Sequence, residues 1–263
     1  MLNGAPQFSL AGKVIIQIGG PGLLGPALVT ALAHSGAKVV ITSRSREKAE
    51  TVARSQKGDD VEVYAEQCSP DSEADVLSLR DRVLAAHQRI DGLVYNAVSF
   101  PMRGGWNDDL ARWQESMTTN ATGYFGAVRA FGDAMAERRS GSIVSIGSIH
   151  GLGGPNPWLY EGTSMKSAPD YFFHKAGMVN LTRFMAAHYG PKGVRANMVA
   201  PGGILDDNNP DPAEFMARYG KMTALGRMAA PAEIAGAVVF LLSDAASYIT
   251  GSTITVDGGY SAR

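Results

Sequence analysis

The sequence is poor in the features that several classes of protein require. It contains one cysteine, Cys68, so it can form neither an internal disulfide nor a cysteine-based metal cluster. Its 24 Lys and Arg residues balance 25 Asp and Glu residues, giving a formal net charge of −1. The basic surface that favours nucleic acids or anionic membranes is therefore missing.

Long apolar runs are also missing. No stretch reaches the length of a membrane-spanning helix, and residues 1–11 lack a basic segment followed by an apolar run. We therefore expect a cytoplasmic protein with no signal peptide, no membrane partner and no nucleic-acid partner. Its composition, 45% hydrophobic and 19% charged, is that of a soluble globular chain.

Short β-branched runs alternate with amphipathic patterns along the whole chain, without repeats or an interdomain linker. The runs predict strands at residues 13–18, 37–43, 61–67, 91–95, 142–147, 194–199 and 253–256. The amphipathic patterns predict helices that include residues 71–88, 110–138, 171–189, 213–222 and a segment from Pro231. This alternation predicts an α/β fold, a single Rossmann domain over residues 1–263 whose doubly wound parallel sheet of about seven strands has helices on both faces.

A glycine-rich turn follows the first predicted strand at once. Gly20, Gly22 and Gly25 satisfy G-x-G-x-x-G between a strand and a helix, the context in which this motif binds a dinucleotide. Glycines allow a tight turn and let the backbone approach a pyrophosphate at a helix N-terminus. The alternative is a glycine-rich turn without a ligand.

The end of the second predicted strand bears on the choice of cofactor. An acid at this place would bind the ribose 2′-hydroxyl of NAD, whereas arginine accommodates the 2′-phosphate of NADP. The chain has Ser43-Arg44-Ser45-Arg46 here and no acid. The pattern favours NADP, with NAD possible; the alternative is a solvated helix start.

Tyr171 and Lys175 form a candidate catalytic pair. They stand four residues apart at the start of a predicted helix, so both side chains project from one face. A neighbouring ammonium favours the phenolate and is expected to lower a pKa that is otherwise about 10. The alternative is a chance pair on a solvated helix face.

Three further positions carry weaker signals. Ser148 follows the fifth predicted strand, where ligands bind in open α/β sheets. Asn120 falls inside a predicted helix, where asparagine is unfavourable, and indicates a kink or a site. Cys68 ends the third predicted strand, as a small core residue or a neighbour of an adenine.

Taken together and in order, these pieces resemble the short-chain dehydrogenase/reductase family over nearly the whole chain. Asn96-Ala97, Pro201-Gly202 and the tail through Asp257-Gly258-Gly259 complete the resemblance. It implies that Tyr171 is the general acid/base, that Lys175 binds the nicotinamide ribose, that Ser148 holds the substrate oxygen and that Asn120 supports a water chain. No metal site is implied. The cofactor-binding residues implied are Gly19, Gly22, Leu23, Leu24, Gly25, Ser43, Arg44, Cys68, Ser69, Asn96, Ala97, Tyr171, Lys175, Pro201, Gly202 and Ile204.

The function expected from this resemblance is NAD(P)-dependent interconversion of a secondary alcohol and a ketone. One alternative is a catalytically idle dinucleotide-binding sensor or scaffold. Two departures from the family's pattern would suit it: Leu23 replaces a glycine of the commonest turn, and Val98 stands where the family usually has glycine after Asn96-Ala97. Another alternative is a methyltransferase, which also uses a glycine-rich first turn but has no need of Tyr171 and Lys175.

The substrate pocket is expected over Ser148 and Tyr171, between residues 151–168 and 205–222. Aromatic faces next to acids and amides suit a small polyhydroxylated, sugar-like molecule. The residues expected to form this wall are Trp158, Leu159, Tyr160, Glu161, Asp206, Asp207, Asn208 and Asn209.

Two predicted helices, 110–138 and 171–189, carry apolar residues around much of their circumference. Exposed apolar surface of that kind marks an interface, and in related proteins these helices pair across a twofold axis. A homo-oligomer is expected, with a tetramer favoured. The residues concerned are Phe125, Val128, Phe131, Met178, Leu181 and Met185.

Overall fold

The computed structural model describes residues 8–56, 58 and 61–262. Within them the chain forms one seven-stranded sheet in the order β3-β2-β1-β4-β5-β6-β7, with every neighbouring pair parallel. The prediction of a doubly wound parallel sheet is confirmed. The strands are β1 (Val14–Ile18), β2 (Lys38–Ser43), β3 (Glu62–Gln67), β4 (Gly92–Tyr95), β5 (Gly141–Ile146), β6 (Val194–Pro201) and β7 (Thr253–Val256).

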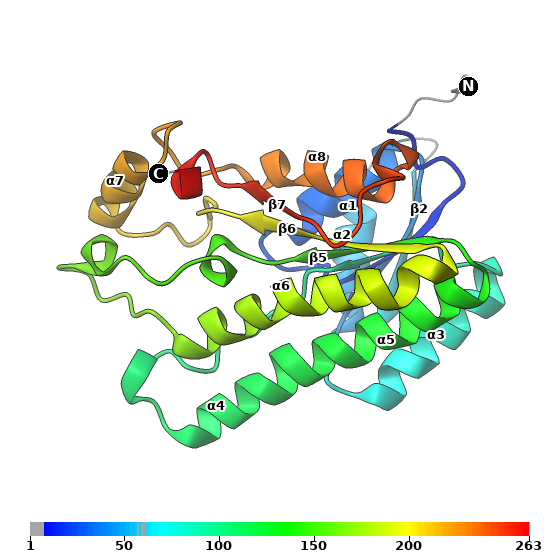
Figure 1. The fold of residues 1–263 in the computed structure, drawn as a ribbon, viewed down its shortest axis with the longest axis horizontal. Helices are drawn as coiled ribbons and strands as arrows, with labels where there is room; N and C mark the ends of the chain where they lie inside the picture. The colour runs from blue at the N-terminus through cyan, green and yellow to red at the C-terminus, as the bar shows by residue number, and fades with distance from the viewer. Residues whose placement is uncertain (1–7, 57, 59–60, 263) are drawn as a thin grey trace.

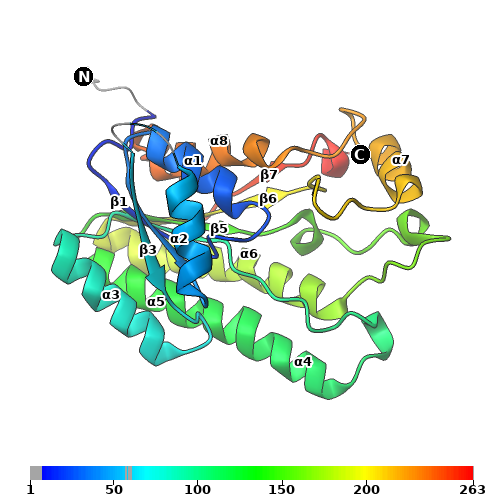
Figure 2. The same cartoon turned by 180° about the vertical axis from the view of Figure 1, so that it is seen from behind.

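Helices cover both faces of the sheet (Figure 1 and, from behind, Figure 2). One face carries α1 (Gly25–His34), α2 (Arg46–Ser55) and α8 (Pro231–Leu242). The other carries α3 (Glu73–His87), α5 (Gly123–Glu137) and α6 (Pro169–Tyr189). Each face has its own apolar core, as expected of a sheet buried on both sides.

The burial of each strand accounts for the pattern of apolar and polar residues along it. Every residue of β1 and β4 is buried, so their apolar runs are continuous rather than alternating. At the edge, β3 is only partly buried and contains two glutamates and a glutamine. Charge on an edge strand opposes pairing with another chain.

The long helix predicted at 110–138 is interrupted. It consists of α4 (Leu110–Ser116), a π-helical turn (Met117–Thr122) and α5. Asn120 lies inside that turn, so the irregularity suggested by an asparagine at this position is present in the structure.

The apolar faces of the two long helices are mostly internal. Val128, Phe131, Met178 and Met185 are buried in the core, so the expectation that these side chains form an exposed surface is wrong. Each of the two helices buries a larger part of its circumference against the core than its apolar periodicity predicted. Phe125 is exposed and Leu181 is partly buried.

The active-site end of the molecule lies beyond the carboxyl ends of the strands. There, α7 (Ala213–Met222) packs against a short 3₁₀ helix (Pro157–Tyr160), as Figure 1 shows at the end toward which β6 and β7 point. The order of the strands reverses between β1 and β4, and ligands bind at such a point in open α/β sheets. Among the described residues, no helix is both long and apolar enough to span a membrane.

Candidate active site

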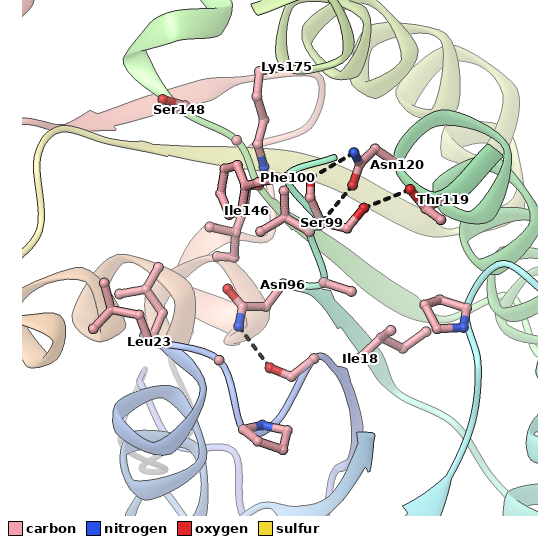
Figure 3. Close-up of a pocket in the computed structure, with 18 of the residues that line it drawn as sticks. Ile18, Leu23, Asn96, Ser99, Phe100, Thr119, Asn120, Ile146, Ser148 and Lys175 are labelled. Atoms are coloured by element: carbon pink, nitrogen blue, oxygen red, sulfur yellow. Dashed lines mark hydrogen bonds between the residues drawn. The ribbon is translucent and has the colours of Figure 1, made fainter. Parts of the chain in front are cut away.

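A cavity of about 430 Å³ opens at the point where the strand order reverses. The turns that follow β1 and β4 meet beneath it. The Asn96 side-chain amide donates a hydrogen bond to the Gly19 carbonyl oxygen at 2.9 Å (Figure 3). Gly19 has a φ of +93°, and a Cβ there would lie 2.7 Å from the Ala97 nitrogen, so the two turns are in direct backbone contact. Any side chain at residue 19 would separate them.

The glycine turn fits a dinucleotide. A Cβ on Gly25 would lie 1.7 Å from the Gly20 carbonyl oxygen, so Gly25 is needed to start α1 against the turn. A Cβ on Gly22 would meet no atom closer than 3.8 Å, and Gly22 borders the cavity. Its missing side chain therefore leaves room for a ligand next to the backbone, which is what a bound pyrophosphate requires.

The cavity continues past the end of β2 to Ser43, Arg44 and Cys68. Arg44 is exposed and forms no ion pair within the described part of the chain, whereas Arg46 pairs with Glu50 at 3.1 Å and does not line the cavity. Of the two arginines after the second strand, only Arg44 borders the cavity where a 2′-phosphate would lie. Burial raises the pKa of Cys68 to about 12, so its thiol stays protonated and unreactive.

The other end of the cavity holds the expected catalytic residues. Ser148, Tyr171, Lys175 and Asn120 all line it, brought together from β5, α6 and the π-helical turn. The Lys175 ammonium donates to the Ile146 carbonyl oxygen at 2.7 Å, and burial lowers the pKa of Lys175 to about 7. Its nitrogen lies 5.5 Å from the centre of the Tyr171 ring.

The expected lowering of the Tyr171 pKa by Lys175 is wrong for this structure. Burial raises the pKa of Tyr171, a hydrogen bond with Ser148 acts in the opposite direction, and Tyr160 raises it further. Removing a phenol from water disfavours its charged form, and here that effect prevails. Tyr171 therefore stays protonated at neutral pH.

Three aromatic rings surround the Tyr171 ring. Phe100 stacks on it with a centroid distance of 5.4 Å, and His150 and His174 meet it edge to face at 5.9 and 5.3 Å. These contacts hold the ring in one orientation, and arrangements of this kind are favourable. No sequence motif selects these three residues together, because they come from three separate segments.

Asn120 fastens the loop after β4 to the π-helical turn. Its side-chain oxygen accepts a hydrogen bond from the Ser99 nitrogen at 2.8 Å, and its amide donates to the Ser99 carbonyl oxygen at 3.0 Å (Figure 3). The amide also donates to the Ser116 hydroxyl at 2.9 Å. Both amide hydrogens are thus used within the protein. The side chain is a strut that sets the position of the loop carrying Phe100.

Most of the expected cofactor-binding residues line the same cavity. The exceptions are Gly25, which acts through the turn, and Ser69, whose hydroxyl donates to Asp71 at 2.6 Å. The sequence reasoning missed a further group of lining residues, for which no motif gave a signal. They are Ile18, Pro21, Thr42, Pro70, Asp71, Val98, Ser99, Phe100, Thr119, Ile146 and Gly147.

A second cavity of about 300 Å³ adjoins the first. The two share Phe100, Ser148, Tyr171, Gly202 and Ile204. It lies between the two segments expected to form the substrate pocket, and Leu159 and Tyr160 line it as expected. Its floor is a small apolar cluster built from the 3₁₀ helix, α7 and the segment that follows α7. The buried members of that cluster are Leu159, Phe215, Tyr219 and Met228.

For the other six residues expected in this wall, one aromatic and five polar, the prediction is wrong. Trp158, Glu161, Asp206, Asp207, Asn208 and Asn209 do not line the second cavity, whereas Lys166 and Asp211 do. Trp158 lies beside the Arg218 guanidinium at 5.9 Å, and Asp206 accepts a hydrogen bond from the Asn208 nitrogen. The turn at residues 206–209 is closed on itself, which brings the next acid, Asp211, to the cavity.

This fold and site define a nicotinamide-dinucleotide-dependent oxidoreductase. The family model described as "Enoyl-(Acyl carrier protein) reductase" matches residues 23–261. The chain is 32% identical to galactitol 2-dehydrogenase (L-tagatose-forming) of Cereibacter sphaeroides, over 96% of each protein. It is 30% identical to D-threitol dehydrogenase of Mycolicibacterium smegmatis, over 98% of this chain and 96% of that protein.

Solved structures agree with the sequence relatives. A gluconate 5-dehydrogenase from Burkholderia cenocepacia, in complex with NADP and tartrate, superposes with a TM-score of 0.88 at 29% identity, over 98% of each chain. The protein belongs to the short-chain dehydrogenase/reductase family.

Proposed function

We propose that this protein interconverts a secondary alcohol and a ketone on a small polyhydroxylated substrate, with NADP(H) as the preferred cofactor. The observation that carries the proposal is the position of Ser148 and Tyr171, which border both cavities. A substrate in the smaller cavity would meet these two hydroxyls at the mouth of the larger one. The site thus offers proton donors to an oxygen placed next to a bound nicotinamide.

The residues along the larger cavity would hold the dinucleotide. The glycine turn would cradle the pyrophosphate, Lys175 would hold the nicotinamide ribose, and Arg44 would meet a 2′-phosphate. The nicotinamide, when bound, supplies or accepts the hydride. The protein's task is then to position the substrate oxygen and to move its proton.

Tyr171 would perform the proton transfer. In reduction, its hydroxyl donates a proton to the substrate oxygen as negative charge develops there, and the Ser148 hydroxyl stabilises the same oxygen. Because burial raises the pKa of Tyr171, the phenol is in its donating form at neutral pH. Alcohol oxidation needs Tyr171 in its proton-accepting form, so its rate should rise with pH.

The substrate class rests on the cavity and on the relatives. Apolar walls suit the C–H faces of a small carbon skeleton, and the polar groups at its rim suit hydroxyls. Two relatives are named as polyol dehydrogenases, and a structural neighbour is named as a gluconate dehydrogenase. These names support a polyol or sugar-like substrate for this chain.

The test is turnover with a panel of polyols, simple secondary alcohols and their ketones, with NADPH and NADH followed by absorbance. Tyr171→Phe should lower kcat by at least about 10²-fold, the usual contribution of a general acid/base. NADPH binding, measured by fluorescence, should persist because Tyr171 is not the main cofactor ligand. Near-normal turnover by Tyr171→Phe would contradict the assignment. NADPH binding without any turnover by the wild-type protein would instead favour an idle sensor or scaffold.

A further inference from the structure

Asp211 is the acidic residue of the substrate cavity. It lies between β6 and α7, two residues before α7 begins, and lines the cavity together with Tyr160, Phe215 and Tyr219. Its side chain is partly buried. Within the described residues it has neither an ion-pair partner nor a hydrogen-bond donor.

Two more deeply buried acids in the described part of the chain, by contrast, have partners. Asp91 pairs with Arg89 at 2.6 Å, and Asp257 accepts hydrogen bonds from the Gly259 nitrogen and from Ser261. Withdrawing a carboxylate from water without such partners is unfavourable. Consistent with this, burial raises the pKa of Asp211, and the neighbouring Asp206 raises it further. A carboxylate that lines a cavity without a protein partner can accept hydrogen bonds from a ligand that brings donors.

We propose that Asp211 accepts hydrogen bonds from substrate hydroxyls remote from the reacting carbon and thereby selects uncharged polyols over hydroxy acids. This inference rests on the proposed function and adds a residue that binds the end of the substrate remote from the reacting carbon. A carboxylate oxygen accepts two or more hydroxyl donors, whereas it repels the carboxylate of an aldonic acid. The neutral polyol is therefore the complementary ligand.

Lys166 is the one opposing feature, because it lines the same cavity and could attract an acid. It is exposed, however, and a Cβ placed on Gly105 would meet its Cβ at 3.3 Å, so the start of its side chain lies along the backbone of Gly105. It forms no ion pair with Asp211. A solvated ammonium binds weakly, whereas a partly buried carboxylate discriminates strongly.

The experiment compares Asp211→Asn with Asp207→Asn, a matched change at an exposed acid of the same segment that does not line the cavity. The substrates are galactitol and D-threitol as neutral polyols, gluconate as a hydroxy acid, and 2-butanol as an alcohol without a second polar group. Asp211→Asn should raise KM for the polyols about 10-fold with little change in kcat, the effect of replacing a charged hydrogen bond by a neutral one. It should raise kcat/KM for gluconate and leave that for 2-butanol unchanged. Asp207→Asn should match the wild-type protein throughout.

Two outcomes would overturn the inference while leaving the hydride chemistry in place. One is turnover of all four substrates with identical constants in Asp211→Asn and Asp207→Asn. The other is a wild-type preference for gluconate that Lys166→Gln abolishes and Asp211→Asn does not affect. Failure of the proposed function looks different, since no alcohol or polyol would then be oxidised although NADPH binds.

Discussion

His174 makes stability depend on pH in a way that can be calculated. Its side chain is 5% exposed, neither ring nitrogen has a hydrogen-bond partner in the described structure, and it meets Tyr171 edge to face. Burial, reinforced by the charge of Lys175, lowers the pKa of His174 from 6.5 to about 3, while the backbone of Asp170 acts in the opposite direction. The folded protein therefore holds this imidazole neutral while the unfolded chain protonates it.

The direction and the size of the pH dependence of stability follow from this difference between the folded and unfolded pKa of His174. Because the folded pKa is depressed, the full stability is present above pH 6.5 and is lost as the pH falls from 6.5 toward 3. The free energy of unfolding falls by about 1.36 kcal/mol per pH unit in that range. Between about pH 8 and pH 5 the loss due to His174 is about 2 kcal/mol.

The measurement is urea unfolding at both pH values and at one fixed protein concentration, for the wild type and for His174→Leu. The variant should gain about 2 kcal/mol relative to the wild type on going from pH 8 to pH 5. Lys175 also titrates with a lowered pKa, but it contributes to both proteins alike. His34→Gln is the control, because His34 is exposed on α1. A difference between His174→Leu and the wild type that does not change with pH would refute the reasoning.

Three other substitutions test the cofactor site and the assembly. Arg44→Ala should weaken NADPH binding by about 1–3 kcal/mol and leave NADH binding almost unchanged. Arg46→Ala should affect the binding of neither cofactor, because the Arg46 side chain is already ion-paired with Glu50. Equal losses of affinity for both cofactors in the Arg44 variant would assign Arg44 a structural role. In unfolding titrations, Gly25→Ala should lower the free energy of unfolding by about 1–3 kcal/mol, because its Cβ would collide with the Gly20 carbonyl oxygen. Gly22→Ala should change that free energy by only about 0.5 kcal/mol, because its Cβ meets no close atom, and it should weaken cofactor binding in a cofactor titration. Phe184 is 63% exposed on α6, so Phe184→Glu should dissociate the expected homotetramer in light scattering at micromolar concentration, and a monomeric wild type would contradict that expectation.

The sequence was informative wherever a feature depends on neighbours along the chain. The apolar runs of β1 and β4, the glycines that open α1 and the one-turn spacing of Tyr171 and Lys175 are local patterns, and local geometry limits each to few conformations. Asn120 belongs here too, because asparagine is unfavourable inside a helix whatever surrounds it. From such features the fold class and the position of the candidate site could be predicted.

The predictions that were wrong concern features that depend on contacts between segments distant in the sequence. Periodicity could not show that Met178 and Phe131 face a common core, because it gives a helix a face but not a partner. The spacing of Tyr171 and Lys175 suggested a lowered phenol pKa, yet the direction is set by burial beneath other segments. Composition placed acids near the substrate, but the turn at residues 206–209 determines that Asp211 is the one that lines the cavity.

By itself, then, the sequence determined the doubly wound sheet, the glycine turn and the candidate residues Ser148, Tyr171 and Lys175, because each depends on local spacing. Only the tertiary structure decided which arginine borders the larger cavity, which rings contact Tyr171 and which carboxylate lines the second cavity. Those outcomes depend on how loops of different origin pack at the carboxyl ends of the strands, where desolvation and unmatched hydrogen-bond partners arise only after folding.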